Sequence, residues 1–237
     1  MAAPTLSKRL EAILAMLRPG GTVVDVCADH ALVALAAVAR GVADRAIAID
    51  RAEAPLALAA ANREAGGLTD RVALRLGNGL APLAEGEGGT LVLAGVGARL
   101  AVEILEAEPE KLAGFSRAIV QPNQEPERVR AWALGAGWHL EDEAIVAEDG
   151  RFFPVLAFRQ SAGPDPAYAQ PGFTPEALCL VGPHLLGRSD AATRAYIEER
   201  RGWTTERARR HPSPAHRAAA AWWAAAAAQL AHLAEQG

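Results

Sequence analysis

The chain has 237 residues, of which 51 % are hydrophobic and 22 % charged, a balance typical of a folded protein rather than a disordered one. Its two cysteines show no disulfide or zinc spacing, and the net charge of −4 gives no overall attraction to a polyanion. No apolar run approaches the roughly 20 residues that span a bilayer, and the N-terminus lacks a signal-peptide pattern, so we expect a cytoplasmic protein.

An amphipathic helix, with apolar residues at helical spacing from Leu6 to Leu17, opens the chain and ends at Pro19-Gly20-Gly21. Apolar strands and Ala-rich helices then alternate, which predicts a parallel sheet covered on both faces. The predicted strands are 22–27, 45–50, 72–76, 90–94 and 117–121, and the predicted helices are 31–40, 55–65, 99–106 and 126–136.

Two strand-like runs, 138–147 and 152–159, follow with no helix between them, and Asp149-Gly150 in their junction predicts a hairpin. A Rossmann-like parallel sheet that ends in an antiparallel hairpin is typical of an α/β class I methyltransferase. Beyond the turn-rich stretch 161–166, the sequence from Pro175 onward favours helices. We therefore expect a catalytic domain over residues 1–162 and a helical domain over residues 163–237.

Polar and small residues follow the predicted strands, where open parallel sheets bind their ligands. Small residues after the first strand allow a nucleotide-type ligand to approach the backbone, and an acid after the second can accept both hydroxyls of a ribose. An amide after the third strand can bind an adenine edge, although a plain turn explains it equally well. The candidate cofactor-binding residues are Asp25, Cys27, Ala28, His30, Asp50, Asn78, Gly79, Gly95 and Gln121.

Over nearly its whole length, the chain resembles the TrmK family of bacterial tRNA (adenine-22 N1)-methyltransferases. The resemblance rests on LSKRL at 6–10, DHA at 29–31, GNGL at 77–80, QPN at 121–123, EDG at 148–150 and GPHLL at 182–186. It implies a Rossmann-like catalytic domain, a helical C-terminal domain and S-adenosylmethionine as the cofactor. The acceptor that it implies is N1 of an adenine in tRNA.

Four departures from the family pattern fall inside the expected site. The family usually has Gly-Ser at Cys27-Ala28, Tyr at Leu32, Asp at Asn78 and Gly-Met-Gly-Gly at 95–98. A side chain at Cys27 can crowd the methionine part of the cofactor. A small-molecule methyltransferase and a noncatalytic relative that binds cofactor or RNA therefore remain alternatives. A nicotinamide-dependent dehydrogenase is disfavoured because the first strand lacks a following Gly-x-Gly-x-x-Gly.

The resemblance also implies two catalytic residues, Asp29 and Asn123, which would orient the adenine after it leaves any base pair. Asp29 would stabilise the positive charge of the methylated base, but it can equally cap the helix that begins near His30. His30 itself can carry a proton or make a structural hydrogen bond. The reaction needs no metal, and no metal-binding spacing is present.

The C-terminal region is locally basic, with eight arginines against four acids from residue 188 to residue 217. This region can dock the tRNA body through its phosphates or simply form a solvated helix face. Trp203, Trp222 and Trp223 can stack bases or pack between helices.

Overall fold

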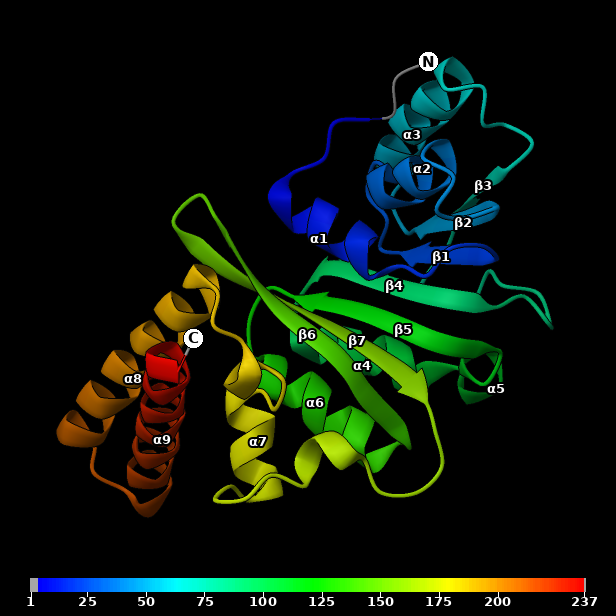
Figure 1. Ribbon diagram of the computed structural model, residues 1–237. Helices are drawn as coiled ribbons and strands as arrows, with labels where there is room; N and C mark the ends of the chain where they lie inside the picture. Colours follow the sequence, from blue (N-terminus) through cyan, green and yellow to red (C-terminus); the bar gives the residue numbers. More distant parts are fainter. Residues whose placement is uncertain (1–3, 237) are drawn as a thin grey trace.

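The computed structural model describes residues 4–236, which form a seven-stranded sheet between two layers of helices (Figure 1). The strand order is β3-β2-β1-β4-β5-β7-β6, and β7 runs opposite to the other strands, so that its pairings with β5 and β6 are antiparallel. The predicted Rossmann-like sheet with a terminal antiparallel hairpin is confirmed. The strands are β1 (Thr22–Val26), β2 (Arg45–Asp50), β3 (Val72–Leu76), β4 (Gly89–Val96), β5 (Phe115–Pro122), β6 (Trp138–Glu148) and β7 (Arg151–Gln160).

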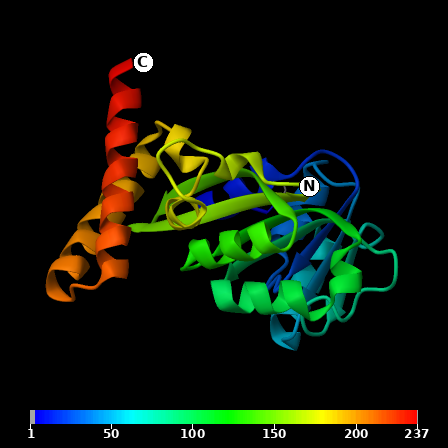
Figure 2. The ribbon, with the colours of Figure 1, turned by 90° about the horizontal axis from the view of Figure 1, so that it is seen from below.

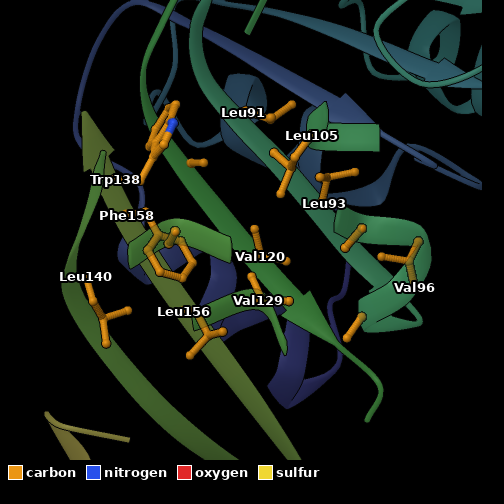
Figure 3. Close-up of a cluster of buried hydrophobic side chains, with 14 of the residues drawn as sticks. Leu91, Leu93, Val96, Leu105, Val120, Val129, Trp138, Leu140, Leu156 and Phe158 are labelled. Atoms are coloured by element: carbon orange, nitrogen blue, oxygen red, sulfur yellow. The ribbon is translucent and has the colours of Figure 1, made fainter. Parts of the chain in front are cut away.

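Alternate strand residues point to opposite faces of the sheet and bury two separate cores. Val23 and Val92 face the core beneath the first three helices, whereas Val24, Leu91 and Leu93 face the core beneath the later ones. Figure 3 shows this second core, where side chains of β4 and β5 meet those of the covering helices. The first layer holds α1 (Lys8–Met16), α2 (Leu32–Ala39) and α3 (Glu53–Ala65), and the second holds α4 (Ala98–Ala107), α5 (Pro109–Leu112) and α6 (Pro126–Gly135).

The sequence predicts these elements to within a few residues, and the largest differences concern strand length. β4 begins at Gly89 and β5 at Phe115, both earlier than their apolar runs indicate. Gly89 has a φ of +119°, and a Cβ there would lie 2.3 Å from the carbonyl oxygen of Thr22. Gly89, which lies just outside the predicted strand 90–94, is part of β4, and the close backbone of the neighbouring strand leaves no room for a side chain there.

The C-terminal region packs on the far end of the sheet, beside β6 (Figure 1, Figure 2). Buried Leu178, Leu185 and Trp223 belong to the same core cluster as the sheet residues, so the core is continuous across the expected boundary after residue 162. That boundary stays a prediction. The elements are η1 (Pro166–Tyr168), α7 (Pro175–Val181), η2 (Leu185–Gly187), α8 (Ala191–Arg210) and α9 (Pro214–Gln236). No helix in the described part of the chain is long and apolar enough to cross a membrane.

A buried ion pair joins this region to the sheet. Arg130 of α6 lies 2.7 Å from the carboxylate of Glu143 of β6, and both side chains are excluded from solvent. Glu143 also accepts a hydrogen bond from the backbone N–H of His184 (2.8 Å), and Arg130 donates to the carbonyl of Cys179 (3.0 Å). A Cβ at Gly182, whose φ is +97°, would lie 2.7 Å from the Arg130 guanidinium. The GPHLL segment thus wraps around this pair.

Candidate active site

A pocket of about 570 Å³ opens beyond the carboxyl ends of β1 and β4, where the strand order changes direction. One wall comes from the loops that follow β1, β4 and β5, and the other comes from α1 and the β6–β7 hairpin. The lining side chains are Arg9, Leu10, Asp25, Cys27, Ala28, Asp29, His30, Leu32, Val33, Ala94, Gly95, Val96, Asn123, Glu148, Asp149, Arg151 and Phe153.

The loop between β1 and α2 has an unusual backbone. Cys27, Asp29 and Ala31 all adopt the left-handed conformation, with φ of 58°, 50° and 53°. This conformation costs a non-glycine residue roughly 1–2 kcal/mol, so the surrounding contacts must hold it. The N–H of Ala28 donates to the carbonyl of Ile49 (3.0 Å), which fixes the loop to β2. The left-handed φ of Cys27 is one that glycine favours, and glycine is the residue that the resemblance implies at this position.

Asp25, near the end of β1, caps α2 from the strand. Its carboxylate accepts a hydrogen bond from the N–H of Ala34 at 3.3 Å, whereas the N-cap residue Ala31 makes no side-chain bond. The alternative interpretation of Asp29 as the helix cap is therefore wrong, because the left-handed turns separate Asp29 from the helix. Asp25 is only 3 % exposed, and burial raises the pKa of its carboxyl group to about 7.

Asp29 and His30 lie together at the pocket wall. The carboxylate of Asp29 is exposed and stands 3.7 Å from Nε2 of His30, while its backbone N–H donates to the carboxylate of Asp50 at 2.8 Å. The other oxygen of Asp50 accepts from the N–H of Ala52 at 3.0 Å. Each oxygen of Asp50 keeps one more acceptor position, as binding to ribose hydroxyls requires.

Four predicted residues lie outside the pocket lining: Asp50, which contacts the lining residue Asp29, and Asn78, Gly79 and Gln121. Asn78 is exposed after β3, and Gly79 follows it with a φ of +55°. Gln121 is completely buried beneath the pocket floor. Its side-chain oxygen accepts from Arg9 (2.8 Å) and from the N–H of Gly95 (3.1 Å), and its nitrogen donates to Pro122. The cofactor-binding roles of these residues stay predictions.

Asn123 is anchored on Gly95, the same residue whose N–H group donates to Gln121. Its side-chain nitrogen donates to the carbonyl of Gly95 at 2.6 Å, and its backbone N–H donates to the carbonyl of Val96 at 2.8 Å. Gly95 itself has a φ of +73°. The fixed amide nitrogen leaves the amide oxygen of Asn123 for a ligand in the pocket.

Sequence reasoning missed the second wall. The guanidinium groups of Arg9 and Arg151 lie 5.4 Å and 5.1 Å from the ring centre of Phe153. The N–H of Lys8 donates to Glu148 at 2.6 Å, which ties α1 to the hairpin. In the sequence, only the LSKRL and EDG segments point to this wall, because they carry the family resemblance without indicating a contact between them. Among the residues that the structure describes, no cluster of ligands could hold a metal ion.

A sheet of this order and a pocket at the ends of β1 and β4 define a Rossmann-like methyltransferase, and residues 6–156 match the family model described as "Methyltransferase domain". The tRNA (adenine(22)-N(1))-methyltransferase of Bacillus subtilis (strain 168) is 35 % identical over 186 residues, which are 78 % of this chain and 77 % of that protein. The chain therefore belongs to the tRNA (adenine(22)-N(1))-methyltransferase family, and the resemblance to TrmK is confirmed.

Solved structures agree with this assignment. The crystal structure of the B. subtilis M1A22 tRNA methyltransferase TrmK has a TM-score of 0.79 and 30 % identity, covering 96 % of this chain and 98 % of that one. The structure of Streptococcus pneumoniae Sp1610, a putative tRNA (m1A22) methyltransferase in complex with S-adenosyl-L-methionine, has a TM-score of 0.81 and 26 % identity. It covers 94 % of this chain and 100 % of that one.

Proposed function

We propose that this protein transfers a methyl group from S-adenosylmethionine to N1 of an adenine in tRNA, in the cytoplasm. The observation that carries the proposal is the two-walled pocket. Its strand-end wall holds a buried acid, Asp25, and an anchored amide, Asn123, while its other wall presents Arg9 and Arg151. The first wall suits a cationic nucleoside cofactor, and the second suits an anionic acceptor.

The residues of the strand-end wall fit S-adenosylmethionine. The pocket volume, about 570 Å³, lies within the roughly 300–1,000 Å³ of small-molecule sites. The Asp25 carboxylate borders it and complements the positive charges of the cofactor's sulfonium and ammonium groups. The cofactor supplies an electrophilic methyl group on positively charged sulfur. Asp50 offers the acceptor positions for the ribose.

Positioning of the adenine falls to Asn123 and Asp29. The amide oxygen of Asn123 would accept from the 6-amino group of adenine, which turns N1 of the same edge toward the methyl group. The exposed carboxylate of Asp29 lines the pocket and would stabilise the positive charge that methylation leaves on the ring. Because N1 lies on the Watson–Crick edge, the adenine must enter this pocket unpaired.

Arg9 and Arg151 would hold the phosphates on either side of the acceptor nucleotide. Phe153 positions both guanidinium groups through cation–π contacts, and Gln121 fixes Arg9 further by a hydrogen bond. Arginine binds phosphate well because its planar donors match the phosphate oxygens. We also include the basic C-terminal region as a docking surface for the tRNA body.

Methyl transfer to tRNA from cells that lack this modification tests the proposal. Purified protein is incubated with this tRNA and methyl-labelled cofactor, and 1-methyladenosine is located by mass spectrometry. Label in small molecules alone would indicate the small-molecule alternative. Cofactor binding by calorimetry without any transfer would indicate a noncatalytic relative.

A matched pair of variants tests the role of the amide. Asn123→Ala should lower kcat for tRNA methylation by roughly 100-fold, since a misplaced acceptor costs about that factor. Asn62→Ala, which changes an exposed asparagine on α3, should leave the rate within twofold. Equal rates for the two variants would remove Asn123 from the mechanism.

A further inference from the structure

The arginines of the C-terminal region are not equivalent in the structure. Half of them have carboxylate partners, so much of the positive charge counted in the sequence is offset locally. These pairs are Arg188 with Asp142, Arg201 with Glu198, and both Arg209 and Arg210 with Glu206. The surface of α8 is therefore not uniformly basic.

Arg200 and Arg207 instead contact an exposed aromatic ring. Their guanidinium carbons lie 5.3 Å and 5.0 Å from the ring centre of Trp203. Residues three and four apart share one face of a helix, so the three side chains form one cluster on α8. Trp203 remains 51 % exposed despite both contacts, whereas Trp223 is completely buried and Trp222 packs against the core. Of these three tryptophans, only Trp203 presents an open ring.

Trp203 forms one side of a groove of about 310 Å³ between α8, α9 and the start of α6. Nε of Arg207 donates to the ring of His216 on α9 at 3.1 Å, which holds this arginine at the groove. Gln124 lines the groove on its α6 side. The preceding residue, Asn123, lines the pocket at the ends of β1 and β4, which we call the methyl-transfer pocket. Because adjacent Cα atoms are about 3.8 Å apart, the pocket and the groove meet at one loop.

We propose that this groove binds an unpaired nucleobase that neighbours the acceptor adenine in the tRNA, with the base stacked on Trp203. This inference rests on the proposed function. Aromatic rings bind any base through its π-face, and the flanking Arg200 and Arg207 attract the phosphates on each side. Glu125 and Glu127 line the α6 side, so the phosphate chain follows the α8 side. The groove thus helps to hold the acceptor strand open.

Fluorescence anisotropy of labelled, unmodified tRNA with the full-length protein measures this contact directly. Trp203→Ala should weaken binding about tenfold, whereas Trp203→Phe, which keeps a ring, should stay within threefold of the unaltered protein. Arg207→Ala should also weaken binding severalfold. Its matched control is Arg209→Ala, because Arg209 lies on the same helix but pairs with Glu206. Cofactor affinity by calorimetry should be unchanged in all four variants.

A second measurement identifies the ligand as a base. Removing the base on the 5′ or the 3′ side of the acceptor adenine should weaken binding to the unaltered protein on at least one side. The Trp203→Ala variant should bind the same abasic tRNA with the affinity that it has for intact tRNA. The inference would be overturned if removing the base weakened binding to Trp203→Ala as much as it weakens binding to the unaltered protein. It would also be overturned if Trp203→Ala bound intact tRNA within twofold of the unaltered protein.

The two proposals fail differently. Trp203-dependent binding without methyl transfer would refute the proposed function and keep the groove as an RNA site. Methyl transfer that is indifferent to Trp203, in affinity and in KM for tRNA, would refute the groove alone. No tRNA binding by the unaltered protein would refute both.

Discussion

The methyl-transfer pocket and the Trp203 groove are built by different means. Backbone hydrogen bonds of neighbouring strands place Asp25, Asp50 and Gly95, so strand order alone brings these residues to one edge. The groove depends on side-chain packing between helices that β6 and α7 hold in place. Residues at strand ends can thus be assigned from chain order, whereas a charged helix must be judged by the partners of each charge.

The buried ion pair between Arg130 and Glu143 joins the C-terminal region, which carries most of the groove, to the sheet, which carries the pocket, and breaking it should have the largest effect. Glu143→Gln leaves a buried guanidinium without its counter-charge, which should lower the free energy of unfolding by about 3–5 kcal/mol. Urea denaturation measures this loss. Glu198→Gln, which breaks an exposed pair on α8, should cost less than about 1 kcal/mol.

This comparison also tests how the regions depend on each other. Glu143 holds the backbone of His184, so its loss should loosen the attachment of the C-terminal helices. Affinity for tRNA should then fall more than affinity for the cofactor. Equal losses of the two affinities would show that the regions unfold as one unit.

The pocket should respond to pH through Asp25, whose buried carboxyl group has a pKa of about 7. A cationic cofactor favours the ionised form, so cofactor affinity should rise roughly tenfold from pH 6 to pH 8. Calorimetry across this range measures the change. Asp25→Asn should abolish the pH dependence, and a slope that persists in this variant would assign it to another group.

The same group should act on stability with the opposite sign. The folded protein keeps a proton on Asp25 that an unfolded carboxyl group releases near pH 4. Stability should therefore fall as the pH rises from about 4 to 7, and this part of the fall should be absent in Asp25→Asn. Thermal unfolding over this pH range compares the two proteins.

The smallest expected effect concerns the left-handed backbone at Cys27. Cys27→Gly removes the steric cost of a φ of 58° but adds chain entropy in the unfolded state. We expect a net gain of about 0.5–1 kcal/mol, or a rise in Tm of about 1–4 °C. Ala28→Gly, at a neighbouring position without a positive φ, should lower Tm instead. Similar shifts in both variants would mean that the loop is not strained at Cys27.

Much of the sheet could be predicted because apolar runs and turn residues determine strands locally, and parallel strands then share one ligand-binding edge. Gln121 shows what strand order alone does not predict. Its position at a strand end predicts a ligand contact, which stays a prediction, and the structure adds that its buried side chain accepts hydrogen bonds from Gly95 and Arg9. Arg9 and Arg151 were missed because their proximity arises only when α1 packs against the hairpin.

The cap of α2 illustrates a second limit. The sequence places Asp29 next to the helix, but the alternating left-handed residues move its carboxylate away, and Asp25 reaches the helix from the strand instead. Backbone conformations of this kind are not visible in sequence when glycine is absent. The pairing of arginines on α8 is equally hidden, because it depends on side-chain orientation.

The short connection from β5 to α6 sets the spacing between two ligands. The Gly95 carbonyl holds Asn123 at one end, and Pro126 begins a helix at the other. Inserting a single residue here would add about 3.8 Å of chain, a large fraction of the distance between successive nucleotides. In such a lengthened enzyme the pocket and the groove would each stay intact, but their spacing would no longer match that of two neighbouring bases.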